Sequence, residues 1–562
     1  MVAFTWSIET MDGREAIGAM LSDQLDAVNP VKLTPAGDAT LNGSTVEGWF
    51  NFETAAARGR GHVRLRDGKC WTLLTAMTEL KGHEEPAGFR RANGLIHQAV
   101  KGGRATWLGR RQYRTRSLGG EVQPYCLIVG GGQSGLMLAA RFERLGVPYL
   151  VIDALPGPGD AWRQRYHSLY LHDAVWMDHF PYMPFPDHWP IYMSKDKIAD
   201  WLEAYCKAME IEFWGSTVCR RAAFDEREKR WAVAVEREGR ALELRPTHLV
   251  IATGLSGRPQ QPRIAGQESF LGLQCHSSEY RSAEGLAGKR CVVIGANNSA
   301  HDICVDLWEA DAEVVMIQRS PTTVLRASSM RRHRDRGPLS EAAVQAGITV
   351  EAADLMGASV PFRLKERDDR TQCQAIQRED AEFYASLKAA GFLFDFGEDE
   401  TAIGGKYMRR ASGYYIDVGG SELVARGEIK VRANVGVREI KPRAVVLTDG
   451  SELPADVIFY ATGYLPMESW IEELVSPEVA AKVGRCWGLG SDTPLDPGPW
   501  AGELRNMWKP TAQANLWMHG GNLAQLRFHS LHLALQIKAR LEGIATLVHN
   551  PQPFVRPPFG AQ

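Results

Sequence analysis

The sequence lacks the features that would assign it to several common classes of protein. Its 562 residues carry 65 Lys and Arg against 67 Asp and Glu, a formal net charge of −2. This balance argues against a protein that binds nucleic acid or an anionic membrane. No uncharged apolar run is long enough to span a bilayer, and no basic-then-apolar segment opens the chain. We therefore expect a cytoplasmic protein without a membrane anchor.

Cysteine is scattered, and metal-binding spacings are missing. None of the nine cysteines forms a C-x-x-C pair, which fits neither a disulfide framework nor a zinc site and indicates a reducing compartment. His529 and His532 share one face of a predicted helix, but no third ligand is evident, so no metal site is predicted. At this length we expect three to four domains.

The strongest motif runs from Tyr125 to Asp153. A short apolar run enters the turn GGGQSG, an amphipathic helical segment follows, and a second apolar run ends at Asp153. This order, with the acid about 20 residues beyond the turn, is that of a dinucleotide-binding unit. Gly130 would make the tight turn, Gly132 would let the backbone approach a pyrophosphate, and Gly135 would let helix and strand pack closely.

Neighbouring residues complete the first predicted site. The pyrophosphate would lie at the positive end of the helix, against the N–H groups of Gln133 and Ser134. Asp153 would accept hydrogen bonds from an adenosine ribose. In the glycine-rich loop that follows, Trp162 would lie over a flat ring, although composition alone also fits an ordinary loop with an aromatic anchor.

A second apolar strand enters another turn, GANNSA, and a helix. Asn297 stands where the middle glycine is expected, and since Asn tolerates left-handed backbone angles, the turn should survive. The next strand ends in Arg319 rather than an acid, and Arg can pair with a 2′-phosphate, which predicts a preference for NADPH. A solvated arginine is the alternative. The residues assigned to this site are Gly295, Asn297, Ser299, Gln318, Arg319 and Ser320.

The first 121 residues carry no nucleotide motif. A helix is predicted over Arg14–Val28, with strands over Val46–Phe52, His62–Leu65 and Cys70–Leu80 and a hairpin turn at Asp67-Gly68. This pattern resembles the nuclear transport factor 2-like α+β cone, which implies either a module for homodimer formation or active-site covering, or a packed accessory domain. Residues 102–124, rich in Arg and Gly, predict a surface linker.

Other segments predict the remaining organisation. A helix capped by Ser194 should run to Ala208, and another should cover Arg378–Ala390. A strand over Ala514–Met518 and a helix over Ser530–Glu542 should end the folded part. Residues 340–400 alternate helical patches and predict an inserted substrate or lid region.

Five motifs occur in one order: GGGQSG, GDAW, F-x-G-x-x-x-H-x-x-x-Y, GANNSA and ATGY. In this they resemble class B flavin-containing monooxygenases, most of all the bacterial, fungal and plant branch related to YUCCA-type indole-pyruvate monooxygenases. The third motif, the most specific, comprises Phe270, Gly272, His276 and Tyr280. The resemblance implies an α/β protein with two Rossmann-like domains: an FAD-binding domain in two parts (122–285 and 461–562) and an NADPH-binding domain (286–460) with a helical insert at about 330–410.

The resemblance also implies a reaction. NADPH would reduce FAD, O₂ would add to form a flavin C4a-hydroperoxide, and one oxygen atom would enter a small organic substrate. His276 and its motif would fix the geometry of the two domains rather than exchange protons. Tyr280-Arg281 replaces the Trp-Pro of Baeyer–Villiger relatives, which lowers the expectation of ketone-to-ester chemistry. His172 and Asn522 are the candidates for the flavin edge.

Several alternatives stay open at this point. The chain could be a Baeyer–Villiger-type monooxygenase, an NADPH oxidase or a non-catalytic flavin-fold binding protein. A disulfide reductase is disfavoured, because Cys126 is the only cysteine near the first turn and has no partner. The sequence does not disclose the substrate.

Overall fold

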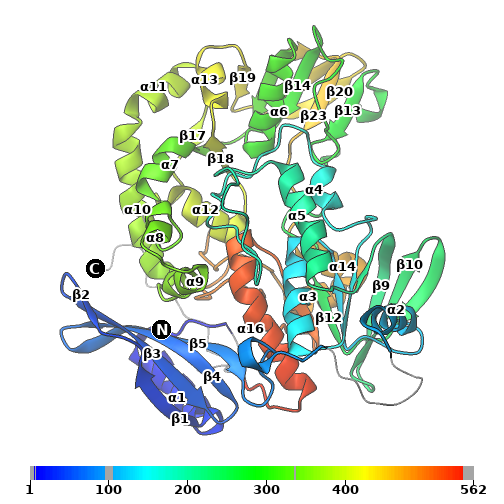
Figure 1. Cartoon of the computed structure of the whole chain (residues 1–562). Coiled ribbons are helices and arrows are strands. Elements are labelled where there is room, and N and C mark those ends of the chain that lie inside the picture. The colour runs from blue at the N-terminus through cyan, green and yellow to red at the C-terminus, as the bar shows by residue number, and fades with distance from the viewer. Residues whose placement is uncertain (1–5, 7, 95–104, 335–336, 549–562) are drawn as a thin grey trace.

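The computed structural model describes residues 6, 8–94, 105–334 and 337–548 and builds them around three five-stranded sheets (Figure 1). Two of these sheets are parallel, and each is followed at its carboxyl edge by one of the two predicted nucleotide turns. The predicted α/β fold with two Rossmann-like units is confirmed. Within the described residues, no helix is both long and apolar enough to cross a bilayer.

The first parallel sheet holds the turn GGGQSG and has the strand order β24-β12-β6-β7-β8. Its central strands are wholly buried because helices or other elements cover both faces. α3 (Gln133–Leu145) packs on β6 and β7, and α16 (Leu523–Leu541) lies beside α3. The strands are β6 (Cys126–Val129), β7 (Tyr149–Ile152), β8 (Phe213–Trp214), β12 (His248–Ile251) and β24 (Leu516–Met518).

The second parallel sheet holds the turn GANNSA and has the order β13-β23-β14-β15-β19. α6 (Asn298–Glu309) packs on β14 and β15, as the predicted strand–turn–helix unit requires. The strands are β13 (Leu273–His276), β14 (Arg290–Ile294), β15 (Glu313–Gln318), β19 (Lys430–Ala433) and β23 (Val457–Tyr460). A hairpin at Asp449-Gly450 joins β21 (Ala444–Leu447) to β22 (Glu452–Pro454), and β20 (Val437–Lys441) pairs with β21.

Because β24 pairs with β12, the chain returns to the first sheet after completing the second. This pairing supports an FAD-binding domain in two parts, although its boundaries stay a prediction. A three-stranded antiparallel sheet, β9 (Thr217–Asp225), β10 (Arg230–Arg237) and β11 (Arg240–Leu244), lies beside the first sheet at the lower right of Figure 1. α5 (Lys195–Ala208) begins after Ser194, whose side chain accepts a hydrogen bond from Lys197 N, so the predicted cap is confirmed.

Helices fill the predicted insert at the left of Figure 1. They are α7 (Ala327–His333), α8 (Glu341–Gln345), α9 (Val350–Ala358), α10 (Phe362–Glu379), α11 (Ala381–Ala389) and α12 (Ala402–Arg410). The single helix predicted over Arg378–Ala390 was wrong, because α10 ends before Asp380 and α11 starts after it. The buried carboxylate of Asp380 meets Arg326 there, at 3.4 Å. A short sheet of β16 (Thr322–Arg326), β17 (Phe394–Asp395) and β18 (Tyr414–Asp417) connects the insert to the second unit.

The N-terminal region forms an antiparallel sheet of order β1-β3-β4-β5, with β2 paired to β3 and α1 packed nearby (Figure 1). The predicted hairpin is confirmed, since Asp67 (φ 49°) and Gly68 (φ 70°) both adopt the left-handed backbone that such a turn needs. The elements are α1 (Gly13–Val28), β1 (Pro30–Pro35), β2 (Thr40–Asn42), β3 (Thr45–Thr54), β4 (Ala57–Arg66) and β5 (Lys69–Leu80). The resemblance to a nuclear transport factor 2-like cone stays a prediction.

Two other predictions need correction. The linker over 102–124, whose residues 102–104 lie outside the described residues, is mostly exposed over 105–116, as predicted, but contains a helix, α2 (Trp107–Ser117). Arg114 holds this helix through two hydrogen bonds to Glu143 on α3, of 2.8 and 2.6 Å. α16 begins at Leu523 rather than at Ser530, because Asn522 and Gln525 form a capping box.

Two glycines of the N-terminal sheet make a matched test of its packing. A Cβ on Gly59 would lie 2.2 Å from Phe52 Cζ and 2.5 Å from the Ala76 carbonyl oxygen, whereas one on Gly48 would have no heavy atom closer than 4.0 Å. Gly59→Ala should therefore cost about 1–3 kcal/mol of folding free energy, by overpacking. Calorimetric unfolding of the whole chain should show a lower transition for Gly59→Ala and an unchanged one for Gly48→Ala. Equal transitions would contradict this packing.

Candidate functional site

The three glycines of the first turn have different surroundings. Gly130 has φ 111° and a Cβ there would lie 2.5 Å from the Ala252 carbonyl oxygen, while a Cβ on Gly135 would lie 1.9 Å from the Gly130 carbonyl oxygen. Gly132 has φ −77°, and a Cβ would meet no atom within 4 Å. Gly130 and Gly135 are thus required by the protein's own packing. At Gly132 open space lies against the backbone, as the approach of a ligand would need.

Several polar groups at the carboxyl edge of the first parallel sheet lack a well-formed hydrogen bond within the described residues. The first turn of α3 has no side-chain cap, so its N–H groups face the open space before Gly132. Thr253, just beyond β12, has a buried hydroxyl with no hydrogen-bond partner. His519 follows β24, and its buried ring lies beside the Ser134 backbone without a well-formed hydrogen bond. Burial lowers the pKa of His519 to about 3, so the ring is neutral. These donors at a positive helix end fit a pyrophosphate.

Asp153 holds the loop in addition to facing the site. Its carboxylate accepts hydrogen bonds from Gly131 N (2.6 Å) and Leu155 N (2.8 Å). Burial raises the pKa of Asp153, and these two hydrogen bonds oppose that rise. Since a carboxylate can accept about four hydrogen bonds, two lone-pair positions remain for the predicted ribose.

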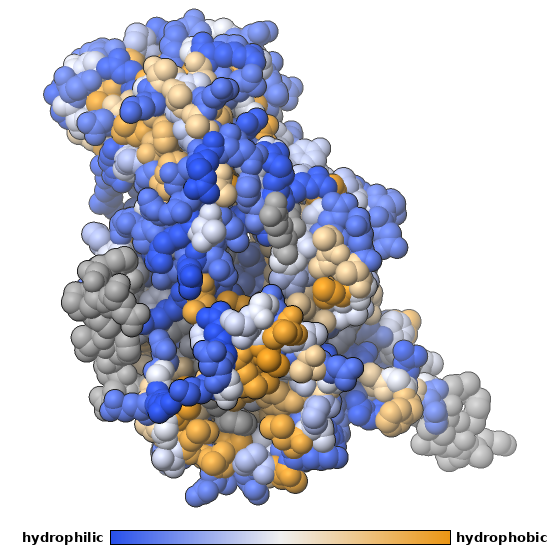
Figure 2. All heavy atoms as spheres, turned by 90° about the vertical axis from the view of Figure 1, so that its left-hand side faces the viewer, coloured by the Kyte–Doolittle hydropathy of each residue, from blue (hydrophilic) through white to orange (hydrophobic). Residues whose placement is uncertain are grey.

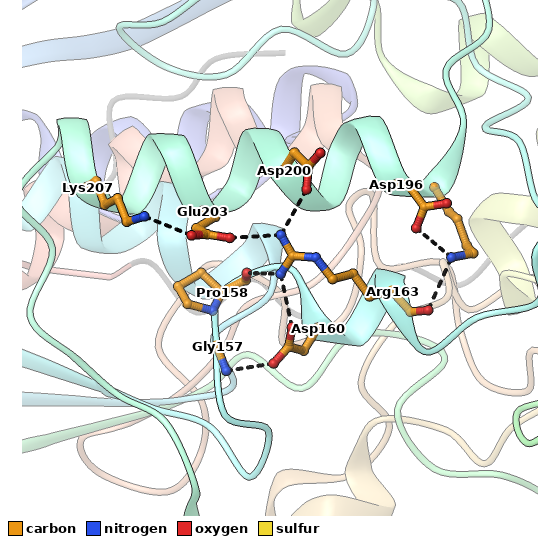
Figure 3. A network of polar contacts seen from close by, with 9 residues as sticks. Gly157, Pro158, Asp160, Arg163, Asp196, Asp200, Glu203 and Lys207 are labelled. Atoms are coloured by element: carbon orange, nitrogen blue, oxygen red, sulfur yellow. Dashed lines mark hydrogen bonds and ion pairs between the residues drawn. The ribbon is translucent and has the colours of Figure 1, made fainter.

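The loop after β7 is tied down by an arginine (Figure 3). Arg163, in the short helix α4 (Asp160–Arg163), donates to the Pro158 carbonyl and to Asp160 and reaches across to Asp200 and Glu203 on α5. The carboxylate of Asp160 also accepts a hydrogen bond from Gly157 N at 2.8 Å. Trp162 is thereby placed so that its indole N–H donates to Gln133 Oε1 at 3.1 Å. The loop and the first turn therefore form one site.

The second turn repeats the backbone of the first. Gly295 has φ 134°, and a Cβ there would lie 2.2 Å from the Ala461 carbonyl oxygen. Asn297 has φ −100° and ψ −168°, close to the −77° and −166° of Gly132. The expectation that Asn297 survives by tolerating left-handed angles was wrong, because this position is extended and any residue can adopt it. Ser299 lies in the first turn of α6 beside the Tyr166 hydroxyl.

Gln318, Arg319 and Ser320, at the end of β15, differ in burial and in their hydrogen-bond partners. Gln318 is fully buried: its amide donates to the Leu393 carbonyl at 2.7 Å and accepts from Leu393 N at 2.8 Å. The prediction that the Gln318 side chain binds a cofactor was therefore wrong, because this side chain anchors the insert instead. Arg319 and Ser320 are exposed, and no described residue pairs with the Arg319 guanidinium. An unpaired cation at this edge fits a phosphate.

Two buried phenols bond to carboxylates of α6, and one of them, Tyr166, joins the two units. Tyr166, just after the loop of the first unit, donates to Asp302 Oδ2 on α6 at 2.6 Å, and Tyr280 donates to Asp306 one turn further along. Burial raises the pKa of both phenols, so both stay protonated donors. The Tyr166 and Tyr280 rings pack together in the core of the second unit. Sequence reasoning missed Tyr166 as a site residue.

The histidine of the third motif has a structural role. His276 is buried, with its Nε2 3.0 Å from the Gly463 carbonyl oxygen, so Nε2 carries the proton and donates. Nδ1 accepts from Ser278 N at 3.1 Å. Burial lowers the pKa of His276, which favours this neutral form. Phe270 is buried in the second unit, and a Cβ on Gly272 would lie 2.1 Å from the Asp456 carbonyl oxygen.

The two candidates for the flavin edge differ. His172 is exposed; burial raises the pKa of the Asp302 carboxyl, and its electrostatic interaction with His172 opposes that rise. Asn522 is the N-cap of α16: its Oδ1 accepts from Gln525 N at 2.9 Å, and its own N–H donates to Gln525 Oε1 and to the Tyr407 hydroxyl. Asn522 therefore has a structural role that the sequence analysis did not assign. Burial also raises the pKa of the Cys126 thiol within β6, which makes it unreactive.

This arrangement agrees with known proteins. A family model described as flavin-binding monooxygenase-like matches residues 158–338. Indole-3-pyruvate monooxygenase YUCCA1 of Oryza sativa subsp. japonica is 32% identical over 356 residues, which are 62% of this chain and 79% of that protein. The chain belongs to the flavin-binding monooxygenase-like family. It is therefore a flavin-containing monooxygenase, and the cofactors of this family are FAD and NADPH.

Other relatives agree on family and fold. Probable indole-3-pyruvate monooxygenase YUCCA9 of Arabidopsis thaliana is 29% identical, over 62% of this chain and 76% of its own. The closed crystal structure of cyclohexanone monooxygenase aligns with a TM-score of 0.54 at 17% identity, over 75% of this chain and 85% of that chain. The crystal structure of cyclohexanone monooxygenase from Rhodococcus sp. Phi1 bound to NADP+ aligns with a TM-score of 0.51 at 17% identity, over 75% of this chain and 84% of that chain. The solved structures support the fold alone.

Two neighbouring glycines can separate ligand approach from protein packing. Gly132→Ala should leave the fold intact but reduce flavin content, because the methyl group would stand where the pyrophosphate approaches. Gly135→Ala should lower the unfolding temperature itself, because its Cβ would collide with the Gly130 carbonyl oxygen. Unfolding temperatures of the flavin-free proteins and flavin absorbance of the purified proteins measure the two effects. Full flavin content in a folded Gly132→Ala protein would contradict the assignment.

Proposed function

We propose that this monooxygenase binds FAD at the first turn and NADPH at the second and transfers one oxygen atom of O₂ to a small organic substrate. The balance is substrate, O₂, NADPH and a proton in, and oxygenated substrate, NADP⁺ and water out. The single observation that carries the assignment is the pair of nucleotide turns on two parallel sheets joined by the Tyr166–Asp302 hydrogen bond.

Residues of the first unit would hold FAD. The N–H groups of Gln133 and Ser134 and the space before Gly132 would take the pyrophosphate, and Asp153 would take the ribose. Trp162, fixed through Gln133, would lie against the cofactor. When bound and reduced, FAD supplies the electrons that activate O₂. The protein's part is to bind, orient and keep water out.

Residues of the second unit would hold NADPH. The helix start at Ser299 and the turn at Gly295 and Asn297 would take its pyrophosphate, and Arg319 with Ser320 would take the 2′-phosphate. Because Tyr166 reaches α6 from the first unit, movement of the second site relative to the first would break the hydrogen bond to Asp302. The nicotinamide and the flavin would thus keep one relative position.

The substrate and the branch within the family belong to this proposal. The similar plant proteins are named for indole-3-pyruvate, and the similar folds are named for cyclohexanone. We propose oxygenation of a substrate other than a simple ketone, because the Baeyer–Villiger motif continues differently at Tyr280-Arg281. Tyr280 is buried and bonded to Asp306, so its place in the motif is occupied by a contact within the second unit. A cytoplasmic location and a homodimer through the N-terminal region stay predictions.

The decisive assay compares the NADPH consumed with the hydrogen peroxide and the oxygenated product formed. Purified holoenzyme is supplied with NADPH and O₂, and NADPH consumption, hydrogen peroxide and oxygenated product are measured over a panel of small amines, thioethers, indoles, carboxylic acids and ketones. We expect one class to accelerate NADPH consumption and to lower the peroxide formed per NADPH. If peroxide equals NADPH consumed with every compound, the protein is an NADPH oxidase. If NADPH is not consumed, it is a binding protein.

Arg319 should select between the two nicotinamide cofactors. Arg319→Glu replaces the cation with an anion beside the 2′-phosphate and should raise the KM for NADPH by tenfold to a hundredfold, an effect of about 1.5–3 kcal/mol, while changing that for NADH little. Arg443→Glu makes the same charge change at an exposed position of the same unit and serves as the control. Equal effects of Arg319→Glu on both cofactors would rule out the assigned role.

A further inference from the structure

A cavity of about 370 Å³ lies where three distant parts of the chain meet. The N-terminal sheet contributes Phe52, Leu74 and Met77, the insert contributes Ala353 from α9, and Phe528 comes from α16. Its volume is within the range of about 300–1,000 Å³ that is typical of ligand pockets. Figure 2 looks at the face where the N-terminal sheet and the insert meet, and shows apolar side chains gathered over its lower half.

The N-terminal wall of this cavity is fixed in place. The Phe52 ring lies over Gly59, and Leu74 packs with Leu355 of α9 and with Phe528. Arg64 of β4 donates to the Ser359 carbonyl oxygen at 2.8 Å and to its Oγ at 2.9 Å, which joins the sheet to the end of α9. The N-terminal sheet is therefore a wall of the cavity rather than a tethered module.

The opposite wall connects the cavity to the flavin unit. Ala524 and Gln525, in the first turn of α16, both line the cavity. That turn follows β24 after residues 519–522, and the carboxyl end of β24 shares an edge with the turn at Gly130. One helical turn thus borders both the proposed FAD site and the cavity.

The charged side chains that line the cavity differ in whether they have a bonding partner. Asp354 is paired with Arg527 by two hydrogen bonds, of 2.8 and 2.7 Å, and Glu503 accepts a hydrogen bond from Thr10. Lys365 of α10, in contrast, has no carboxylate within ion-pairing distance among the described residues, and its Nζ lies 5.0 Å from the Phe362 ring centre. Burial lowers the pKa of Lys365, while Glu503 and Asp369 raise it from a distance.

We propose that this cavity is the substrate pocket, that the N-terminal sheet sets its specificity, and that Lys365 receives an anionic group of an otherwise apolar substrate. A half-buried cation without an ion-pair partner, at the edge of an apolar space, gains most from an anion. The proposal rests on the proposed function, since it places the substrate at the first turn of α16. Lys365 binds and positions the substrate and takes no part in the chemistry.

Two fluorescent probes test the pocket without turnover. 1-Anilinonaphthalene-8-sulfonate and N-phenyl-1-naphthylamine share one apolar body and differ in the sulfonate. Holoenzyme should bind the sulfonate roughly tenfold or more tightly than the neutral probe, and Lys365→Met should remove that difference. Lys388→Met, on the exposed face of α11, is the control. No preference for the sulfonate, or a preference that survives Lys365→Met, would overturn the role of Lys365.

Filling variants test the walls. Met77→Trp from the N-terminal sheet and Ala353→Phe from α9 should each weaken both probes at least tenfold, because they occupy the cavity. Thr78→Trp and Ala352→Phe, at neighbouring positions outside the lining, should not. Unchanged probe binding in folded filling variants would overturn the pocket.

The flavin is the independent readout. Each folded variant should keep its FAD and its anaerobic reduction by NADPH, because no substituted residue belongs to the nucleotide sites. A wild-type protein that binds the probes but is not reduced would refute the proposed function and leave the cavity as a binding site. A protein that is reduced but shows none of the probe effects would refute the pocket alone.

Discussion

The structure depends on the hydrogen bond that joins the Tyr166 hydroxyl to the Asp302 carboxylate. Two sheets that each bind a nucleotide can cooperate only if their carboxyl edges face one another at a fixed separation. The phenol comes from the loop that Arg163 and Trp162 fix against the first turn, and the carboxylate from the helix that starts the second turn. Tyr166 is buried and Asp302 is half-buried, so loss of this hydrogen bond to a charged group would cost about 1.5–3 kcal/mol.

The same constraint explains what surrounds it. Tyr280 makes a second phenol–carboxylate contact on α6, and neutral His276 bridges β13 to the strand end at Gly463. The insert is anchored to the second unit by Gln318 and to α16 by the Arg527–Asp354 pair. The N-terminal sheet then closes the space between the insert and α16, so that elements far apart in the chain enclose one cavity next to the first unit.

Local chemistry made much of this fold predictable from the sequence. The glycine turns, their flanking buried strands, the Ser194 cap and the Asp67-Gly68 hairpin depend on residues close together in the chain. Features that rest on distant contacts were not predictable. The helix α2 is held by a hydrogen bond from Arg114 to Glu143 of α3, and the Gln318 side chain is hydrogen-bonded to the backbone of Leu393. Asn297 and Asn522 were interpreted by residue type, whereas their roles follow from backbone angles and capping. The cavity joins three distant segments, so no motif marks it.

The central claim is that the two units hold NADPH and FAD in one productive relation through Tyr166. Anaerobic stopped-flow mixing of FAD-loaded protein with NADPH, followed by flavin absorbance, tests this most directly in the wild type and in Tyr166→Phe. The account predicts rapid reduction of the wild type and reduction slowed by roughly a hundredfold in Tyr166→Phe, since small displacements of reacting groups cost about that much, with FAD content and NADPH affinity retained. Wild-type flavin that stays oxidised, or identical reduction rates in the two proteins, would contradict it.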